Sequence, residues 1–134
     1  MKRSGLALTI TLLAISLTGC GESGPATYPV SGTVTLDGQP LENGRIVFRD
    51  TERKISSAGG PITNGEFSFR SQPATMRVEI NARREIPGKF VSPAPGEKVP
   101  LTEETIPARY NKKSEMTKEV TEGENTFEFA LTSE

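Results

Sequence analysis

Few side chains in this chain could do chemistry. Histidine is absent from all 134 residues, and Cys20 is the only cysteine. Ser-His-Asp and Cys-His nucleophiles need an imidazole that exchanges a proton near neutral pH, so both are excluded. A zinc site usually needs several thiolate or imidazole ligands, which one cysteine does not supply. We therefore predict a protein that is not an enzyme and that holds no metal or cofactor.

Acidic residues form one candidate site. Glu103 and Glu104 are adjacent, with Glu97 nearby, and carboxylate oxygens suit calcium or an acid/base pair. No D-x-D-x-D-G loop accompanies them, so we favour solvated charge. The segment from Glu85 to Pro107 holds five of the ten prolines and is predicted to be a long loop. Such loops often carry binding function, although a stiff connection without a ligand is the simpler interpretation.

Two basic groups are further candidates. Arg109, Tyr110 and Asn111 could contact a carboxylate, a sugar, a peptide terminus or a protein partner. The interpretation we favour is structural: the Tyr110 hydroxyl bonds to backbone at a sheet edge, and Asn111 and Ser114 cap a turn.

The second basic group consists of Arg77, Arg83 and Arg84, which suit an exposed strand face, with a phosphate clamp as the alternative. The formal net charge of the chain is −1. Nucleic-acid binding requires a basic surface, so no nucleic-acid partner is expected.

The N-terminal segment has the organisation of a secretory signal. Lys2 and Arg3 precede an uncharged apolar run from Gly5 to Leu17. A transmembrane helix needs about 20 residues, so this run is too short to span a bilayer comfortably. Its length fits the apolar region of a signal peptide. Cys20 follows directly after the small residues Thr18 and Gly19.

The stretch Leu17-Thr18-Gly19-Cys20 resembles the lipobox of bacterial lipoproteins at all four positions. The resemblance implies cleavage after Gly19, a diacylglycerol thioether on Cys20 and an acyl chain on the new amino terminus. Stable anchoring in a membrane requires more than one acyl chain. Residues 1–19 are then the signal peptide and residues 20–28 a tether. Gly21 replaces the aspartate that retains lipoproteins at the inner membrane, which favours the outer membrane.

Period-two alternation from residue 28 onward predicts β-strands. It occurs in five stretches, at residues 30–36, 46–48, 66–70, 76–81 and 127–131, separated by turn signals such as Asn64-Gly65. Residues 112–120 fit either a helical turn or a strand that pairs with the last one. These short strands and the turn signals between them predict an all-β, antiparallel two-sheet sandwich over residues 29–134.

VSGTVTLDGQPLENGRIVF followed by ITNGEFSF resembles a carboxypeptidase-regulatory-like domain, which is a transthyretin-like β-sandwich. In the later half, IPARYNKKSEMTKEVTEGENTFEFAL, with its I-P-x-x-Y-N-x-x-S and N-x-F-x-F-x-L patterns, resembles the closing segment of small predicted lipoproteins of planctomycete-type bacteria. Gln72-Pro73-Ala74 stands where the domain family has Pro-Gly.

The function expected from these features is binding at a membrane surface. We predict a non-enzymatic, lipid-anchored protein of the cell envelope whose β-sandwich serves protein binding, adhesion or envelope organisation. The partner would be an envelope protein or polysaccharide. A cell-surface carbohydrate-binding module is the alternative, although the chain has no tryptophan for a sugar platform. The last strand, residues 125–132, could also be an edge that accepts a partner strand.

Overall fold

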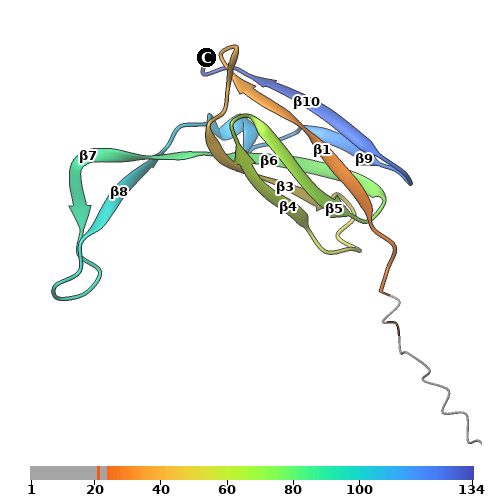
Figure 1. Cartoon of the computed structure of the whole chain (residues 1–134), viewed down its shortest axis with the longest axis horizontal. Helices are drawn as coiled ribbons and strands as arrows, with labels where there is room; N and C mark the ends of the chain where they lie inside the picture. The colour runs from red at the N-terminus through yellow and green to blue at the C-terminus, as the bar shows by residue number, and fades with distance from the viewer. Residues whose placement is uncertain (1–20, 22–23) are drawn as a thin grey trace, which may run out of the picture.

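The alternating segments form strands in the computed structural model, which describes residue 21 and residues 24–134 (Figure 1). One short 3-10 turn, Ala108–Tyr110, interrupts them. In chain order the strands are β1 (Tyr28–Leu36), β2 (Gln39–Pro40), β3 (Asn43–Asp50), β4 (Ala58–Thr63), β5 (Glu66–Ser71), β6 (Ala74–Asn81), β7 (Arg83–Val91), β8 (Val99–Glu104), β9 (Thr117–Val120) and β10 (Asn125–Leu131).

The main sheet has the strand order β10-β1-β5-β4-β3-β6-β9, with β2 paired to β1. Between β4 and β5 the only ladder pair is Thr63 with Glu66, beside the turn. The sheet therefore curls at this point and packs its two halves, β10-β1-β5 and β4-β3-β6-β9, against each other. The predicted all-β architecture is thus observed, but both layers of the body come from one curled sheet and not from two separate sheets.

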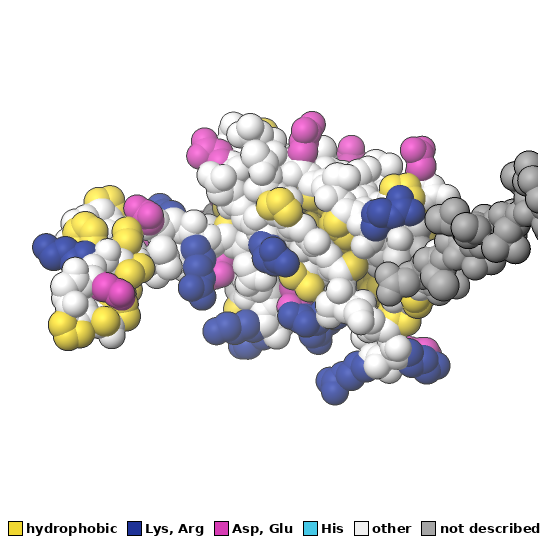
Figure 2. Space-filling model, turned by 60° about the horizontal axis from the view of Figure 1, so that its bottom comes forward, with side chains coloured by type: hydrophobic (Ala, Val, Ile, Leu, Met, Phe, Trp, Pro, Cys, Tyr) yellow, Lys and Arg dark blue, Asp and Glu magenta, His cyan; other side chains and the backbone are white. Residues whose placement is uncertain are grey.

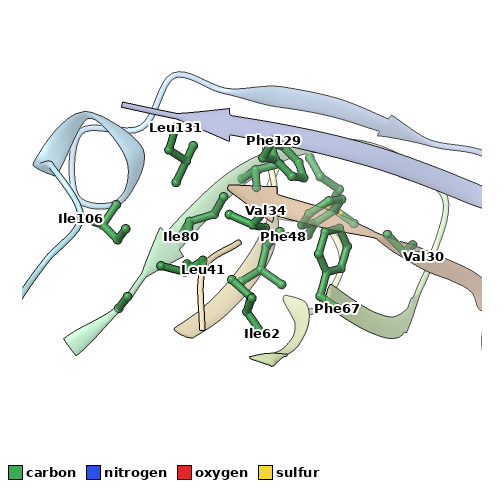
Figure 3. Packing of buried hydrophobic residues seen from close by; sticks show 14 of the residues in the cluster. Val30, Val34, Leu41, Phe48, Ile62, Phe67, Ile80, Ile106, Phe129 and Leu131 are labelled. Atoms are coloured by element: carbon green, nitrogen blue, oxygen red, sulfur yellow. The ribbon is translucent and has the colours of Figure 1, made fainter. Parts of the chain in front are cut away.

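The core fills the space between these halves (Figure 3). Phe48 of β3 is fully buried, and its ring centroid lies 5.1 Å from that of Phe69 and 6.5 Å from that of Phe129. Those partners come from β5 and β10, so aromatic edge contacts join the two layers. Met76, Val78 and Ile80 of β6 are also fully buried. The alternating residues predicted to face inward in β3 and β6 do so.

Both sharp turns have the conformations that their sequences favour. Asn64 and Gly65 have φ values of 50° and 78°, and Asp37 and Gly38 have values of 51° and 80°. Positive φ at both central residues is typical of type I′ hairpin turns. The Asn64-Gly65 hairpin prediction is confirmed: β4 and β5 run antiparallel on either side of it.

Three predictions of local structure need correction. Residues 85–107 are not one loop, because β7 and β8 form an antiparallel hairpin inside this range. Residues 117–120 form strand β9, which pairs with β6 and not with β10. Strand β10 pairs with β1 in parallel, from Val30 with Asn125 to Leu36 with Leu131, in an otherwise antiparallel sheet. The β6–β9 and β1–β10 pairings are long-range and leave no local signal in the sequence.

All described strands and all described core residues lie between Tyr28 and Leu131. Among the described residues ahead of β1, Thr27 accepts hydrogen bonds from Arg70 through its hydroxyl and its carbonyl oxygen. A fragment of residues 24–134 therefore contains the whole core and its capping interactions. In the part of the chain that is described, no helix is long and apolar enough to cross a membrane.

Candidate functional site

The β7–β8 hairpin projects from the sandwich as a separate two-stranded sheet (teal and cyan in Figure 1). Hydrogen bonds fix its base to the body. The Thr105 backbone N–H donates to the Ala82 carbonyl oxygen at 2.8 Å. Glu104 Oε1 accepts the Ala82 N–H at 2.8 Å and the Ile106 N–H at 3.3 Å. Ala82 and Ile106 are themselves buried in the core, so the hairpin leaves the body from a fixed point.

Ion pairs join the two strands just above that base. Arg84 Nε lies 2.6 Å from Glu103 Oε1, and Arg83 Nε lies 4.0 Å from Glu104 Oε2. The acidic pair considered as a calcium or acid/base site is therefore engaged in holding the hairpin strands together. Among the described residues, no three histidine, cysteine, aspartate or glutamate side chains gather closely enough to hold a metal ion.

The outer part of the hairpin presents apolar side chains to solvent. Phe90, Val91 and Val99 are 57%, 44% and 45% exposed. They are neighbours, since Val91 pairs with Val99 and Phe90 with Pro100. Figure 2 shows hydrophobic side chains gathered on this projecting lobe. We call these four residues the hairpin tip. Exposed apolar side chains that gather in this way often mark an interaction surface.

The hairpin leaves the end of the sandwich opposite to the start of β1. Tyr28, the first residue of β1, pairs with Ser71 at the end of β5. Strand β6 starts three residues later, at Ala74, and runs to the far end, where β7 follows at Arg83. Figure 1 shows the same arrangement, with the hairpin and the beginning of β1 at opposite ends.

Arg109 and Tyr110 bind the C-terminal residues of the chain. An Arg109 Nη2 atom donates to the Thr132 carbonyl oxygen at 2.6 Å, and the guanidinium carbon lies 4.7 Å from the centroid of the Tyr110 ring. The Tyr110 hydroxyl accepts the Thr132 N–H at 3.1 Å. Hydrogen bonding to the Thr132 side chain, then to its backbone, and the adjacent Arg109 lower the pKa of Tyr110 to about 8.

Asn111 is buried, and its side chain bonds to the backbone of this turn and to the Ile80 carbonyl oxygen of β6. Its side-chain nitrogen donates to the Ile106 carbonyl oxygen at 3.2 Å, and its side-chain oxygen accepts the Lys112 N–H at 2.7 Å. Ser114, also buried, donates to the Val78 carbonyl oxygen. The geometry of Arg109, Tyr110 and Asn111 thus supports turn and strand-end packing, and a ligand contact there stays a prediction. Gly19 and Cys20 lie outside the described residues.

A second feature is a hollow of about 550 Å³ on the outer face of β3 and β6. Its lining is Arg49, Asp50, Thr51, Arg53, Ile55, Ser57 and Arg77, and we call it the arginine hollow. Arg83 and Arg84 are not part of it, so the three arginines grouped from the sequence are not brought together. Arg77 instead meets Arg49, to which it is paired across the strands.

Sequence reasoning missed both features. Phe90, Val91 and Val99 lie in a proline-rich stretch without alternation, and an apolar cluster flanked by prolines was the only available signal. The arginine hollow combines residues from two strands and a loop, so only the β3–β6 register reveals it.

Comparisons with known proteins leave the family open. No protein-family model and no curated protein sequence matches the chain. Two of the solved structures that match the chain are the following. One is a 9R-lipoxygenase from Cyanothece PCC8801, with a TM-score of 0.44, 14% identity, and coverage of 79% of this chain but 16% of the lipoxygenase. The other is the dioxygenase domain of a dioxygenase–carbohydrate-binding protein fusion from Streptomyces sp. SirexAA-E, with a TM-score of 0.39, 19% identity, and coverage of 83% and 82%. Neither similarity carries a functional argument.

Proposed function

We propose that this protein is a lipid-anchored, non-enzymatic component of the cell envelope that binds a partner protein through the tip of the β7–β8 hairpin. The hairpin is the single observation that carries the proposal. It buries little of its own surface, and Phe90 is more than half exposed. A two-stranded hairpin alone is at best marginally stable in water. An element of this kind is suited to gaining its stability from a partner.

The chemistry of the hairpin favours recognition through side chains over strand addition. Pro87, Pro93, Pro95 and Pro100 lie in or next to its strands, and proline has no N–H to donate to an added strand. The partner would therefore offer an apolar pocket for Phe90 and its neighbours. Lys89 and Lys98 flank the tip and suit an acidic rim on that pocket.

The lipid anchor would place this tip away from the membrane. Seven residues separate Cys20, the residue that resembles a lipidation site, from the start of β1, and the hairpin leaves the other end of the sandwich. We favour the outer membrane because Gly21 follows Cys20. Mass spectrometry of the mature amino terminus tests the anchor. Unmodified Cys20, or cleavage at another bond, would contradict it.

Site-specific photo-crosslinking in intact cells tests the partner. A photoreactive residue would replace Val99 in the full chain, and Glu128, an exposed residue of β10, would serve as the control position. We expect one discrete adduct of higher mass from position 99, none from position 128, and loss of the adduct when Phe90→Ser is added. Equal labelling from both positions, or an adduct that survives Phe90→Ser, would overturn the proposal.

A further inference from the structure

We propose that the arginine hollow binds the phosphate groups of anionic lipids and so sets the orientation of the domain on the membrane that anchors it. The inference rests on the proposed lipid anchor for its biological setting. The phosphate site itself is argued from the geometry of the hollow, and its test needs no anchor.

The guanidinium groups of the hollow are held in place with donors to spare. Glu79, whose side chain is 14% exposed, accepts from Arg49 Nε at 3.0 Å through one oxygen and from Arg77 Nη2 at 2.7 Å through the other. Arg49 Nη1 also donates to Ser57 Oγ at 3.3 Å. These bonds leave Arg49 Nη2 and the Nε and Nη1 atoms of Arg77 for a ligand. Guanidinium donors in a fixed fork match the oxygens of phosphate.

Arg53 adds a third cation from the loop after β3. It has a positive φ of 58° and, among the described residues, no ion-pair partner. The buried Asp50 carboxylate shapes this loop, because it accepts the N–H groups of Glu52, Lys54 and Ile55 at 3.0, 2.7 and 3.1 Å. The Asp50 charge is thus directed to backbone donors within the loop. Three arginines against the carboxylates of Glu79 and Asp50 leave the hollow with a formal charge of +1.

Basic and acidic side chains also lie on different sides of the domain. Figure 2 shows Lys and Arg side chains gathered along one side of the body and Asp and Glu along the other. Removal of Lys2 and Arg3 with the predicted signal peptide leaves 14 basic and 17 acidic residues. A cationic hollow on a chain of net negative charge points to a specific anionic ligand more than to general attraction.

The hollow also lies at the end of the sandwich where the chain enters. Asp50 pairs with Met76 near the start of β6, the same end as Tyr28 and Ser71. The eight residue-to-residue steps from Cys20 to Tyr28 span at most about 28 Å when fully extended. The proposed anchor would therefore keep the hollow within reach of the lipid headgroups, and this position selects membrane phosphate over a soluble phosphate.

Vesicle partitioning of the fragment 24–134, which contains the whole core, tests the inference. Vesicles of phosphatidylglycerol would be compared with vesicles of phosphatidylcholine in 0.1 M salt. We expect preferential binding to phosphatidylglycerol, and we expect Arg53→Gln or Arg77→Gln to lower partitioning about fivefold each. Circular dichroism would confirm that each variant is folded.

Arg45→Gln is the matched control. Arg45 lies on the same strand and outer face as Arg49 but pairs with Asn81, outside the hollow. Four residues of strand separate the two, about 13 Å, which exceeds the Debye length of about 10 Å at 0.1 M salt. We expect this control to lose less than twofold. Equal losses from Arg45→Gln and Arg53→Gln, or no preference between the two vesicle types, would overturn the inference.

Two further measurements are needed. The first distinguishes lipid phosphate from soluble phosphate as the ligand, and the second distinguishes failure of this inference from failure of the proposed function. Binding of inorganic phosphate without any preference for phosphatidylglycerol would assign the hollow to a soluble ligand and refute a membrane role. The variant Phe90→Ser should leave vesicle binding unchanged. If instead Phe90→Ser abolishes binding while Arg53→Gln does not, the hairpin tip is a membrane element, and both proposals fail. Failure of the arginine variants alone leaves the hairpin's protein partner in place.

Discussion

Replacement of Gly32 by alanine should destabilise the domain, although the same change in an ordinary strand position would be favourable. Gly32 lies in the middle of β1, between Phe127 of β10 and Phe67 of β5. A Cβ atom built on it would overlap the Phe127 carbonyl oxygen and lie 2.8 Å from the Phe127 carbonyl carbon and 2.9 Å from Phe67 Cζ. Real Cβ atoms essentially never approach other heavy atoms within 3.0 Å.

The loss of stability in Gly32→Ala depends on which atoms must move to make room for the new Cβ. The Phe67 ring can rotate, but the Phe127 carbonyl is backbone, so β10 must shift relative to β1. Overpacking of this kind costs about 1–3 kcal/mol. Loss of one or two ladder hydrogen bonds adds about 1 kcal/mol each. The gain of about 0.5–1 kcal/mol from replacing glycine in a strand offsets part of this. We expect a net loss of about 2–4 kcal/mol, against a total stability of about 5–15 kcal/mol for a domain.

Urea denaturation of the fragment 24–134 measures this loss, with Gly60→Ala as the control. Gly60 is also a buried strand glycine, but the nearest atoms to its added Cβ are Ser68 O at 3.4 Å and Phe69 Cβ at 3.6 Å, ordinary contact distances. The control should change the free energy of unfolding by less than about 1 kcal/mol. Equal midpoints for Gly32→Ala and Gly60→Ala, with equal slopes, would refute the close parallel pairing of β1 and β10.

Three further outcomes are expected. Phe48→Ala should lower the free energy of unfolding by about 3–5 kcal/mol because its ring is fully buried, whereas Phe90→Ala should change it by less than about 0.5 kcal/mol; thermal unfolding compares the two. Tyr110 should ionise near pH 8 in a spectrophotometric titration and at higher pH in Arg109→Gln. Because the folded-state pKa of Tyr110 lies below the ordinary tyrosine value of about 10, the stability that its ionisation adds is full above pH 10 and is lost as the pH falls through about 8. Glu104→Gln should weaken the hairpin base by about 1–2 kcal/mol, because the Ala82 and Ile106 N–H groups would then bond to a neutral amide oxygen in place of a charged carboxylate. Hydrogen exchange at Ala82 and the hairpin amides should then become faster. Unchanged exchange would contradict the role of this carboxylate.

Strands with one buried face were predictable because burial imposes alternation on the sequence. In β6, Met76, Val78 and Ile80 are buried while Thr75 and Arg77 are exposed, so the period of two is explicit. Strands β7 and β8 have no buried face, and selection for a core leaves no such pattern in them. Their prolines also resemble loop composition, which explains why residues 85–107 were interpreted as a loop.

Pairing partners were less predictable than strands. The parallel contact of β1 with β10 joins residues almost a hundred positions apart, and nothing local encodes it. Gly32 is required by that contact, because the absence of a side chain leaves room for the Phe127 carbonyl. The glycine was recognised in the sequence as part of a family-like pattern, but its reason lies in the register. The arginine hollow was also unpredictable from the sequence, because Arg49 and Arg77 are brought together only by the pairing of β3 with β6.

The two proposed surfaces should respond oppositely to salt, and this difference separates them. Binding of lipid phosphate by Arg49, Arg53 and Arg77 is electrostatic, and the Debye length falls from about 10 Å at 0.1 M salt to about 3 Å at 1 M. Vesicle binding through the hollow should then largely disappear. Contact through the hairpin tip is apolar, and a salt such as sulfate strengthens the burial of apolar surface. Crosslinking from position 99 should therefore persist or increase in sulfate. Loss of both signals together would mean that one electrostatic surface accounts for both, and the hairpin would no longer need a partner of its own.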